Sequence, residues 1–358
     1  MSKAKLLRKT PLLSSLAVLL AAIVLLLVAG SKDLEIASSA YGSLDKAAPY
    51  VSAIAVLPGY LLFALSGYMI TSEIADESSK AKDLLNTIPL IVMSIGSGAL
   101  YGFMSISKII SSIYLAVSIG IVLMVGLTML FMWLYEKLGE KSLTSAGYVL
   151  LTSFVLAFLI SFLSNLVVIR PSYKGMLEKE GASDLFLDWW NFKSSDPEYI
   201  EKAGLDIAYL RGGISLNSSL SALTLLLPLA MPKKIKMKEA IASAFAFLFI
   251  ILSIVSELSD GNHYLSEIAW GLIIVSLLII LLISNKGLYS AESVIVMTKE
   301  EGYKLRMHGE NASAKALRLS KGTSSRREMM MKKKYNSSKT FLAVSSLSEA
   351  HAKGRKRK

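Results

Sequence analysis

The sequence predicts an all-α polytopic membrane protein with about eight transmembrane helices. Of its 358 residues, 53% are hydrophobic and only 18% are charged, which is too apolar for a soluble protein with a charged surface. Several uninterrupted apolar runs approach the roughly 20 residues that a helix needs to span a bilayer. Because the chain has no cysteine and only three histidines, two of them in the C-terminal tail, we expect no metal site and no cofactor.

Eight apolar runs account for the predicted helices, with polar or charged segments between them. The first run follows a short basic N-terminus and is long for a cleaved signal peptide, so we interpret it as a membrane span, with cleavage as the alternative. The second contains Pro58, which predicts a kink. The runs cover residues 12–29, 50–70, 88–104, 109–135, 149–169, 218–230, 240–255 and 268–283.

The distribution of basic residues predicts the orientation in the membrane. With a cytoplasmic N-terminus, the densest basic loop (residues 233–238) and the basic tail both fall inside. The sequence therefore predicts an integral cell-membrane protein with both termini in the cytoplasm. The longest loop, residues 170–213, then lies outside, where its aromatic residues suit a helix along the membrane surface or one packed on the bundle.

The net charge of +12 belongs to the tail. From Lys299 to Lys358 there are 17 Lys and Arg against 5 Asp and Glu, so the rest of the chain is balanced. Such a basic, serine-rich segment does not fold alone. We expect it to meet anionic lipid headgroups, at about 1 kcal/mol per basic residue near the surface. Nucleic acid or ribosome binding, and a solvated tail that only fixes orientation, are the alternatives.

Polar residues that suit phosphate chemistry gather on the predicted outer face. His263 precedes Glu267 by four positions, a helical spacing that lets the carboxylate orient the imidazole as a nucleophile. Arg170 closes the fifth span, and a guanidinium matches phosphate oxygens. A Gly/Ser-rich turn with Arg211 and Ser218 opens the sixth, offering backbone N–H groups to an anion. Taken singly, these features also fit a polar turn, an interfacial anchor and small-residue helix packing.

These residues resemble the signature of the type 2 phosphatidic acid phosphatase superfamily, which are membrane lipid phosphatases and phosphotransferases. Ser256, His263 and Glu267 fall on the serine, histidine and acid of its third motif at the same spacing. Arg170, followed by proline, matches the first motif, and Ser218 matches the second. The order of the motifs and their placement on a six-helix core also fit.

The resemblance implies a mechanism and a division of the chain. His263 would form a phosphohistidine on a lipid phosphate at the outer face, and Glu267 would orient it. The phosphate-binding residues would be Arg170, Ser218, Arg211 and Lys174, the last two as nearby cations. The chain would divide into two N-terminal spans (1–87), the six-helix core (88–286) and the cytoplasmic tail (287–358).

Three departures from the signature bear on activity. Leu163 replaces a lysine, Leu220 replaces the leaving-group histidine, and Glu257 replaces an arginine. A general acid is worth about 10²–10⁴-fold, and a diphosphate, with its better leaving group, needs it least. An active site would therefore favour a prenyl or polyprenyl diphosphate. The alternative is a catalytically inactive lipid-binding scaffold of the same fold, or a transporter-like protein.

Overall fold

The computed structural model describes residues 9–71, 80–138, 144–167, 170–177, 186, 213–231 and 239–284. The chain divides into two units, Met1–Leu288 and Tyr289–Lys358, and the second unit lies outside the described residues together with our predictions for the tail. Both N-terminal spans belong to the first unit. The predicted boundary at residue 87 therefore stays a prediction that rests on the resemblance.

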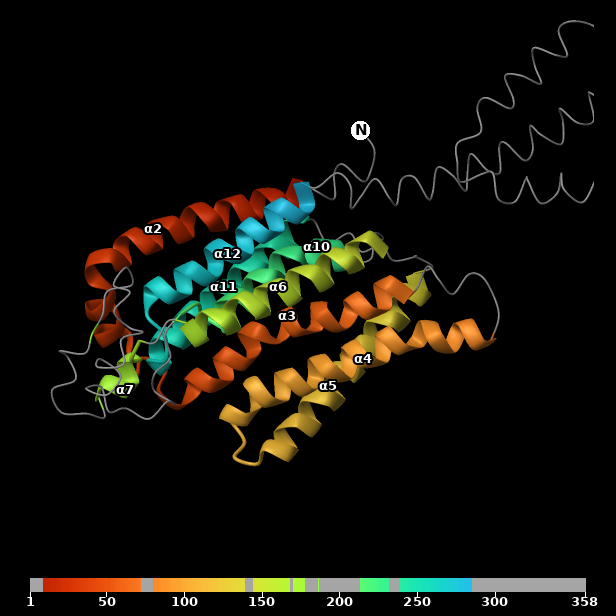
Figure 1. The fold of residues 1–358 in the computed structure, drawn as a ribbon, viewed down its shortest axis with the longest axis horizontal. Helices are drawn as coiled ribbons and strands as arrows, with labels where there is room; N and C mark the ends of the chain where they lie inside the picture. The colour runs from red at the N-terminus through yellow and green to blue at the C-terminus, as the bar shows by residue number, and fades with distance from the viewer. Residues whose placement is uncertain are drawn as a thin grey trace, which may run out of the picture. The chain divides into compact units, whose positions relative to one another are not determined.

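Seven helices in the described ranges are long and apolar enough to cross a membrane, which confirms the predicted all-α polytopic class (Figure 1). The sixth run (residues 218–230) forms shorter helices, so the count of eight spans stays a prediction. The long helices are α2 (Lys9–Ala40), α3 (Ala48–Thr71), α4 (Lys80–Met104), α5 (Ile113–Leu138), α6 (Thr144–Val167), α11 (Glu239–Asp260) and α12 (Leu265–Ser284).

Helix α3 is the most enclosed of the seven. It continues through Pro58 without ending and packs against α4, α6 and α11. In Figure 1 it lies between α6 and α4, whereas α2 runs beside α12. Four helix ends lie together: the ends of α2 and α11 and the starts of α3 and α12. The Gly42 N–H, just after α2, donates to the Ser259 carbonyl near the end of α11 (2.9 Å). We call this the site end of the bundle.

Helix α2 is longer than the sequence analysis predicts. We placed a polar loop after residue 29, but the helix continues to Ala40 and has 32 residues. At 1.5 Å per residue it is about 48 Å long, well beyond the roughly 30 Å hydrocarbon core of a bilayer. Its extension is helical because Leu34 and Ala37 pack on a cluster with Met176 and Tyr264.

The sixth apolar run forms α9 (Leu216–Ala222), a 3-10 segment (Leu223–Leu226) and α10 (Leu227–Ala230). This short run is enclosed by the long helices, and most of its leucines are almost fully buried, namely Leu220, Leu223, Leu225, Leu226 and Leu229. At the site end, Asn217 Nδ2 donates to Ser52 Oγ (3.1 Å). At the other end, Tyr135 donates to the Ala230 carbonyl (2.6 Å). The short run therefore lies inside the bundle, with one end beside Ser52 of α3 and the other beside Tyr135 of α5.

Gly271 lets α12 approach the start of α9. A Cβ there would overlap Ser218 Oγ and would lie 2.9 Å from the Ser215 carbonyl oxygen. Small residues at helix contacts allow this kind of close backbone approach in membrane bundles.

We therefore predict that Gly271→Ala destabilises the protein by about 1–3 kcal/mol, since the added methyl overpacks this contact. Gly126→Ala on α5 is the matched control, because its Cβ would have no neighbour within 4 Å. That control should be neutral or stabilising by up to about 1 kcal/mol, because alanine favours helix. Thermal unfolding of the purified protein in detergent measures both, and equal midpoints for the two variants would contradict the packing.

Candidate functional site

Arg170 lies at the site end, just beyond α6, and only 3% of it is exposed. Its Nη2 donates to Asp33 Oδ2 at 3.0 Å. Its Nη1 donates to Ser266 Oγ (3.1 Å) and to Glu267 Oε1 (3.4 Å). The guanidinium thus joins α2, the segment after α6 and α12, and two carboxylates neutralise its charge.

Two aromatic rings complete the surroundings of this guanidinium. Its central carbon lies 3.9 Å from the ring centroid of Tyr264 and 4.9 Å from that of Phe186, both within cation–π range. Within the described residues, Nε of Arg170 has no hydrogen-bond partner. The cation is therefore held by carboxylates and rings, with one donor left over.

Asp33 is a site residue that the sequence analysis missed. Its carboxylate accepts from the backbone N–H of Ser266 (3.1 Å) and from the Ser266 hydroxyl, in addition to Arg170. A pattern in the sequence points to it, because Ala29, Asp33 and Ala37 are spaced by four and share the buried face of α2. We placed this stretch in a loop, so that helical spacing carried no weight.

His263 and Glu267 meet as their spacing predicts. Nδ1 of His263 lies 2.9 Å from Glu267 Oε2, and the histidine side chain is 13% exposed. Burial lowers the pKa of His263, but the hydrogen bond to Glu267 and the charges of Glu257 and Glu267 outweigh burial and the opposing charge of Lys108. The pKa of His263 therefore lies above its usual value, and the proton on Nδ1 is donated to Glu267.

The hydrogen bonds of Ser218 to Ser215 lie within the first turn of α9. Its backbone N–H donates to Ser215 Oγ (3.1 Å), which caps α9, and its hydroxyl donates to the Ser215 carbonyl (3.0 Å). The Ser215 hydroxyl lies 2.6 Å from both oxygens of Glu257, which is 2% exposed. We expected this turn to offer donors to an anion. Instead, the Ser218 N–H bonds to the cap of α9, and the Ser215 hydroxyl bonds to a buried carboxylate.

The remaining predicted residues contribute no described contact to this network. The backbone N–H of Lys174 donates to the Gly261 carbonyl (3.0 Å), beside the turn before α12. Arg211 lies outside the described residues. Leu163 is 54% exposed on α6, and Leu220 is fully buried where α9 meets Gly59 of α3.

The described network places carboxylates beside each of its cations. Asp33 and Glu267 pair with Arg170, and Glu267 together with the charge of Glu257 acts on His263. Lys108, on an exposed turn between α4 and α5, is the further cation that influences His263. Among the described residues, no three His, Cys, Asp or Glu side chains are grouped to hold a metal ion. An added phosphate would therefore meet carboxylates that already bind both cations.

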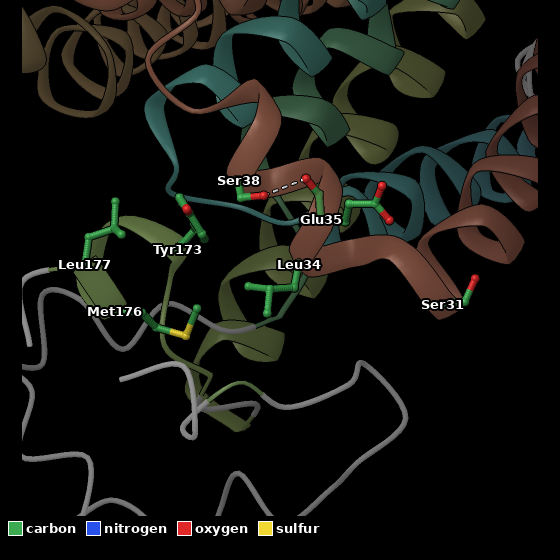
Figure 2. Close-up of a pocket in the computed structure, with 7 residues that line it drawn as sticks. All are labelled: Ser31, Leu34, Glu35, Ser38, Tyr173, Met176 and Leu177. Atoms are coloured by element: carbon green, nitrogen blue, oxygen red, sulfur yellow. Dashed lines mark hydrogen bonds between the residues drawn. The ribbon is translucent and has the colours of Figure 1, made fainter. Parts of the chain in front are cut away.

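An open cavity of about 560 Å³ lies between the C-terminal turns of α2 and the short helix α7 (Tyr173–Leu177) (Figure 2). One wall is apolar and the other carries hydroxyls and a single carboxylate, with no cation among the described lining residues. The lining residues are Ser31, Leu34, Glu35, Ser38, Tyr173, Met176 and Leu177.

Comparisons with protein-family models, with curated proteins and with solved structures give no match to this chain. The helices therefore define the class, an all-α polytopic membrane protein. What distinguishes this particular chain within that class is a buried charge network at one end of the bundle, centred on Arg170.

We predict that Arg170→Gln destabilises the protein by about 3–5 kcal/mol, because it leaves Asp33 and Glu267 buried without a counter-charge. Adding Asp33→Asn should recover part of this loss, so the two effects will not be additive. Denaturant unfolding of the single and double variants measures the coupling. Lys32→Gln, which removes an exposed ion pair with Glu35 (3.9 Å), should change little and serves as the control. Additive losses would exclude a direct Arg170–Asp33 interaction.

We also predict a pH dependence that His263 causes. Because its folded pKa is raised, protonated His263 adds stability that is fully present below the usual histidine pKa and disappears as pH rises through the folded value. The stability difference between the wild type and His263→Gln should therefore be largest in acid and shrink in alkali. Unfolding midpoints over a pH series test this, and a difference that grows with pH would show the opposite coupling.

Proposed function

We propose that this chain is a non-catalytic, lipid-binding integral membrane protein whose phosphatase-like site is neutralised by its own carboxylates. The observation that carries this proposal is the ion pair of Arg170 and Asp33, 3.0 Å long, in which both side chains are 3% exposed. Phosphoryl transfer depends on positive charge aimed at the phosphate oxygens. A guanidinium shared by two carboxylates does not supply that charge.

Two further positions support a non-catalytic role. Leu220, where the resemblance expects the acid for the leaving group, is fully buried against α3. Glu257, where it expects a phosphate-binding arginine, is a buried carboxylate bonded to Ser215. Either change alone weakens catalysis, and together they remove both the proton donor and a cation.

Lipid binding is supported by the position and lining of the cavity beside the network. The outer turns of α2 extend beyond the length that a bilayer core requires, so a cavity on them suits the headgroup level. Its α7 wall presents Met176 and Leu177, and its α2 wall combines Leu34 with the hydroxyls of Ser31 and Ser38. Such a mixed lining fits the boundary between headgroup and acyl chain.

The placement in the membrane is part of the same proposal. We infer that both termini are cytoplasmic and that the site end faces outward, as the basic loop and tail indicate. The tail then lies on the cytoplasmic side, where anionic lipid headgroups are its proposed partner.

A second candidate is a lipid phosphatase or phosphotransferase that acts on a polyprenyl diphosphate through a phosphohistidine. The distance of 2.9 Å between His263 Nδ1 and Glu267 favours it, because the carboxylate then holds the ring by one nitrogen. The other nitrogen, Nε2, would attack phosphorus once unprotonated, a phosphate monoester would leave, and water would release the phosphate from the histidine.

One assay separates the two candidates. We expect purified protein to release no more phosphate from a polyprenyl diphosphate than His263→Ala does, because Arg170 is already neutralised. Both proteins are assayed in the same detergent at equal concentration, with Lys32→Gln as a control for surface substitution. Release by the wild type that His263→Ala loses would overturn the non-catalytic proposal and establish the phosphohistidine route.

A further inference from the structure

Asp33 is bonded as a bound oxyanion would be. One of its oxygens accepts from the Ser266 backbone N–H at 3.1 Å. The other accepts from Arg170 Nη2 at 3.0 Å and from the Ser266 hydroxyl. A guanidinium, a hydroxyl and a backbone N–H are the donors that proteins use for phosphate groups.

The donors come from two elements other than α2. Ser266 is the second residue of the 20-residue helix α12, and in this first turn the N–H groups of Glu267 and Ile268 bond to the Tyr264 carbonyl, whereas that of Ser266 reaches Asp33. Arg170 comes from a different segment, is 3% exposed, and keeps an unpartnered Nε among the described residues. Helix terminus and buried guanidinium thus converge on the one carboxylate that α2 supplies.

We propose that this is an oxyanion site for a phosphate group, and that Asp33 occupies it as an internal ligand. The inference rests on the proposed lipid-binding function and names the ligand class as the phosphate of a lipid headgroup or free phosphate. A phosphodiester carries one negative charge, as the Asp33 carboxylate does. Exchange of one for the other leaves the charge around Arg170 unchanged, whereas a phosphate dianion adds a charge beside Glu267.

The position of Asp33 on α2 suits such an exchange. It lies on the helical extension, where its neighbours Ser31, Lys32 and Glu35 are exposed, and Ser31 and Glu35 also line the cavity of Figure 2. A modest movement of this one helical end would withdraw the carboxylate. The apparent affinity of the wild type for phosphate is therefore its intrinsic affinity multiplied by the fraction of molecules in which Asp33 has left the site.

Removing the internal ligand should expose the site. We expect Asp33→Ala to bind inorganic phosphate at least about tenfold more tightly than the wild type, as measured by calorimetry on the full chain in detergent. Asp33→Ala combined with Arg170→Gln should lose this gain. A folded Asp33→Ala that binds phosphate no better than the wild type overturns the proposal. Micelles containing phosphatidic acid or phosphatidylcholine then separate a lipid headgroup from free phosphate as the source.

A labelling experiment tests the same site even if Asp33→Ala does not fold. The chain has no cysteine, so Asp33→Cys carries a single thiol inside the proposed anion site. An anionic sulfonate thiosulfonate reagent should modify it faster than a cationic trimethylammonium one, and phosphate should slow the reaction. Ser39→Cys, on the exposed side of α2 and outside the lining of the cavity, should show neither effect. Equal rates at Asp33→Cys, or a faster cationic reagent, would exclude an anion site.

These results are independent of the phosphate-release assay. Hydrolysis by the wild type would overturn the non-catalytic function yet leave the Asp33 site to be judged by binding and labelling. Conversely, if binding and labelling both show no anion site at Asp33, the non-catalytic function would still be supported by the absence of phosphate release.

Discussion

A guanidinium inside an apolar bundle has to be neutralised where it lies, and the site end of this protein is organised by that requirement. The desolvation cost of an unpaired buried charge amounts to several kcal/mol, so Arg170 is stable only with carboxylates beside it. Asp33 and Glu267 meet this need from α2 and α12, which lie far apart in the sequence. The ion pairs thereby fix where the N-terminal helix sits against the last one.

The same requirement governs the uncharged polar groups nearby. A helix that starts inside the bundle cannot leave its first N–H groups unbonded, and Ser215 satisfies one of them at Ser218. The hydroxyl of Ser215 in turn bonds to Glu257. The hydroxyls of Ser215, Ser218 and Ser219 all have acceptors within the fold, so these side chains stabilise a buried helix start.

Much of this architecture could be predicted from the sequence, because long apolar runs and i, i+4 spacings are local signals. The long apolar runs gave the helices, and the spacing of His263 and Glu267 gave their contact. Asp33 was missed because the boundary of α2 was set by hydropathy alone, so its i, i+4 spacing with Ala29 and Ala37 carried no weight, and its partners lie more than a hundred residues away. The helix extends past that boundary because Leu34 and Ala37 pack on Tyr264, a tertiary effect with no local signature.

The residue types at signature positions indicate which chemistry a site could perform, whereas the charges around them decide which ligand it can bind. Arg170, His263 and Glu267 lie in one network, yet Asp33 also pairs with Arg170, and the buried Glu257 lies close enough to act on His263. In a low-dielectric interior each added carboxylate opposes an incoming anion over several ångströms. For this chain, an anion becomes acceptable at Arg170 only as a replacement for Asp33, and that makes the outer end of α2 the element on which ligand binding depends.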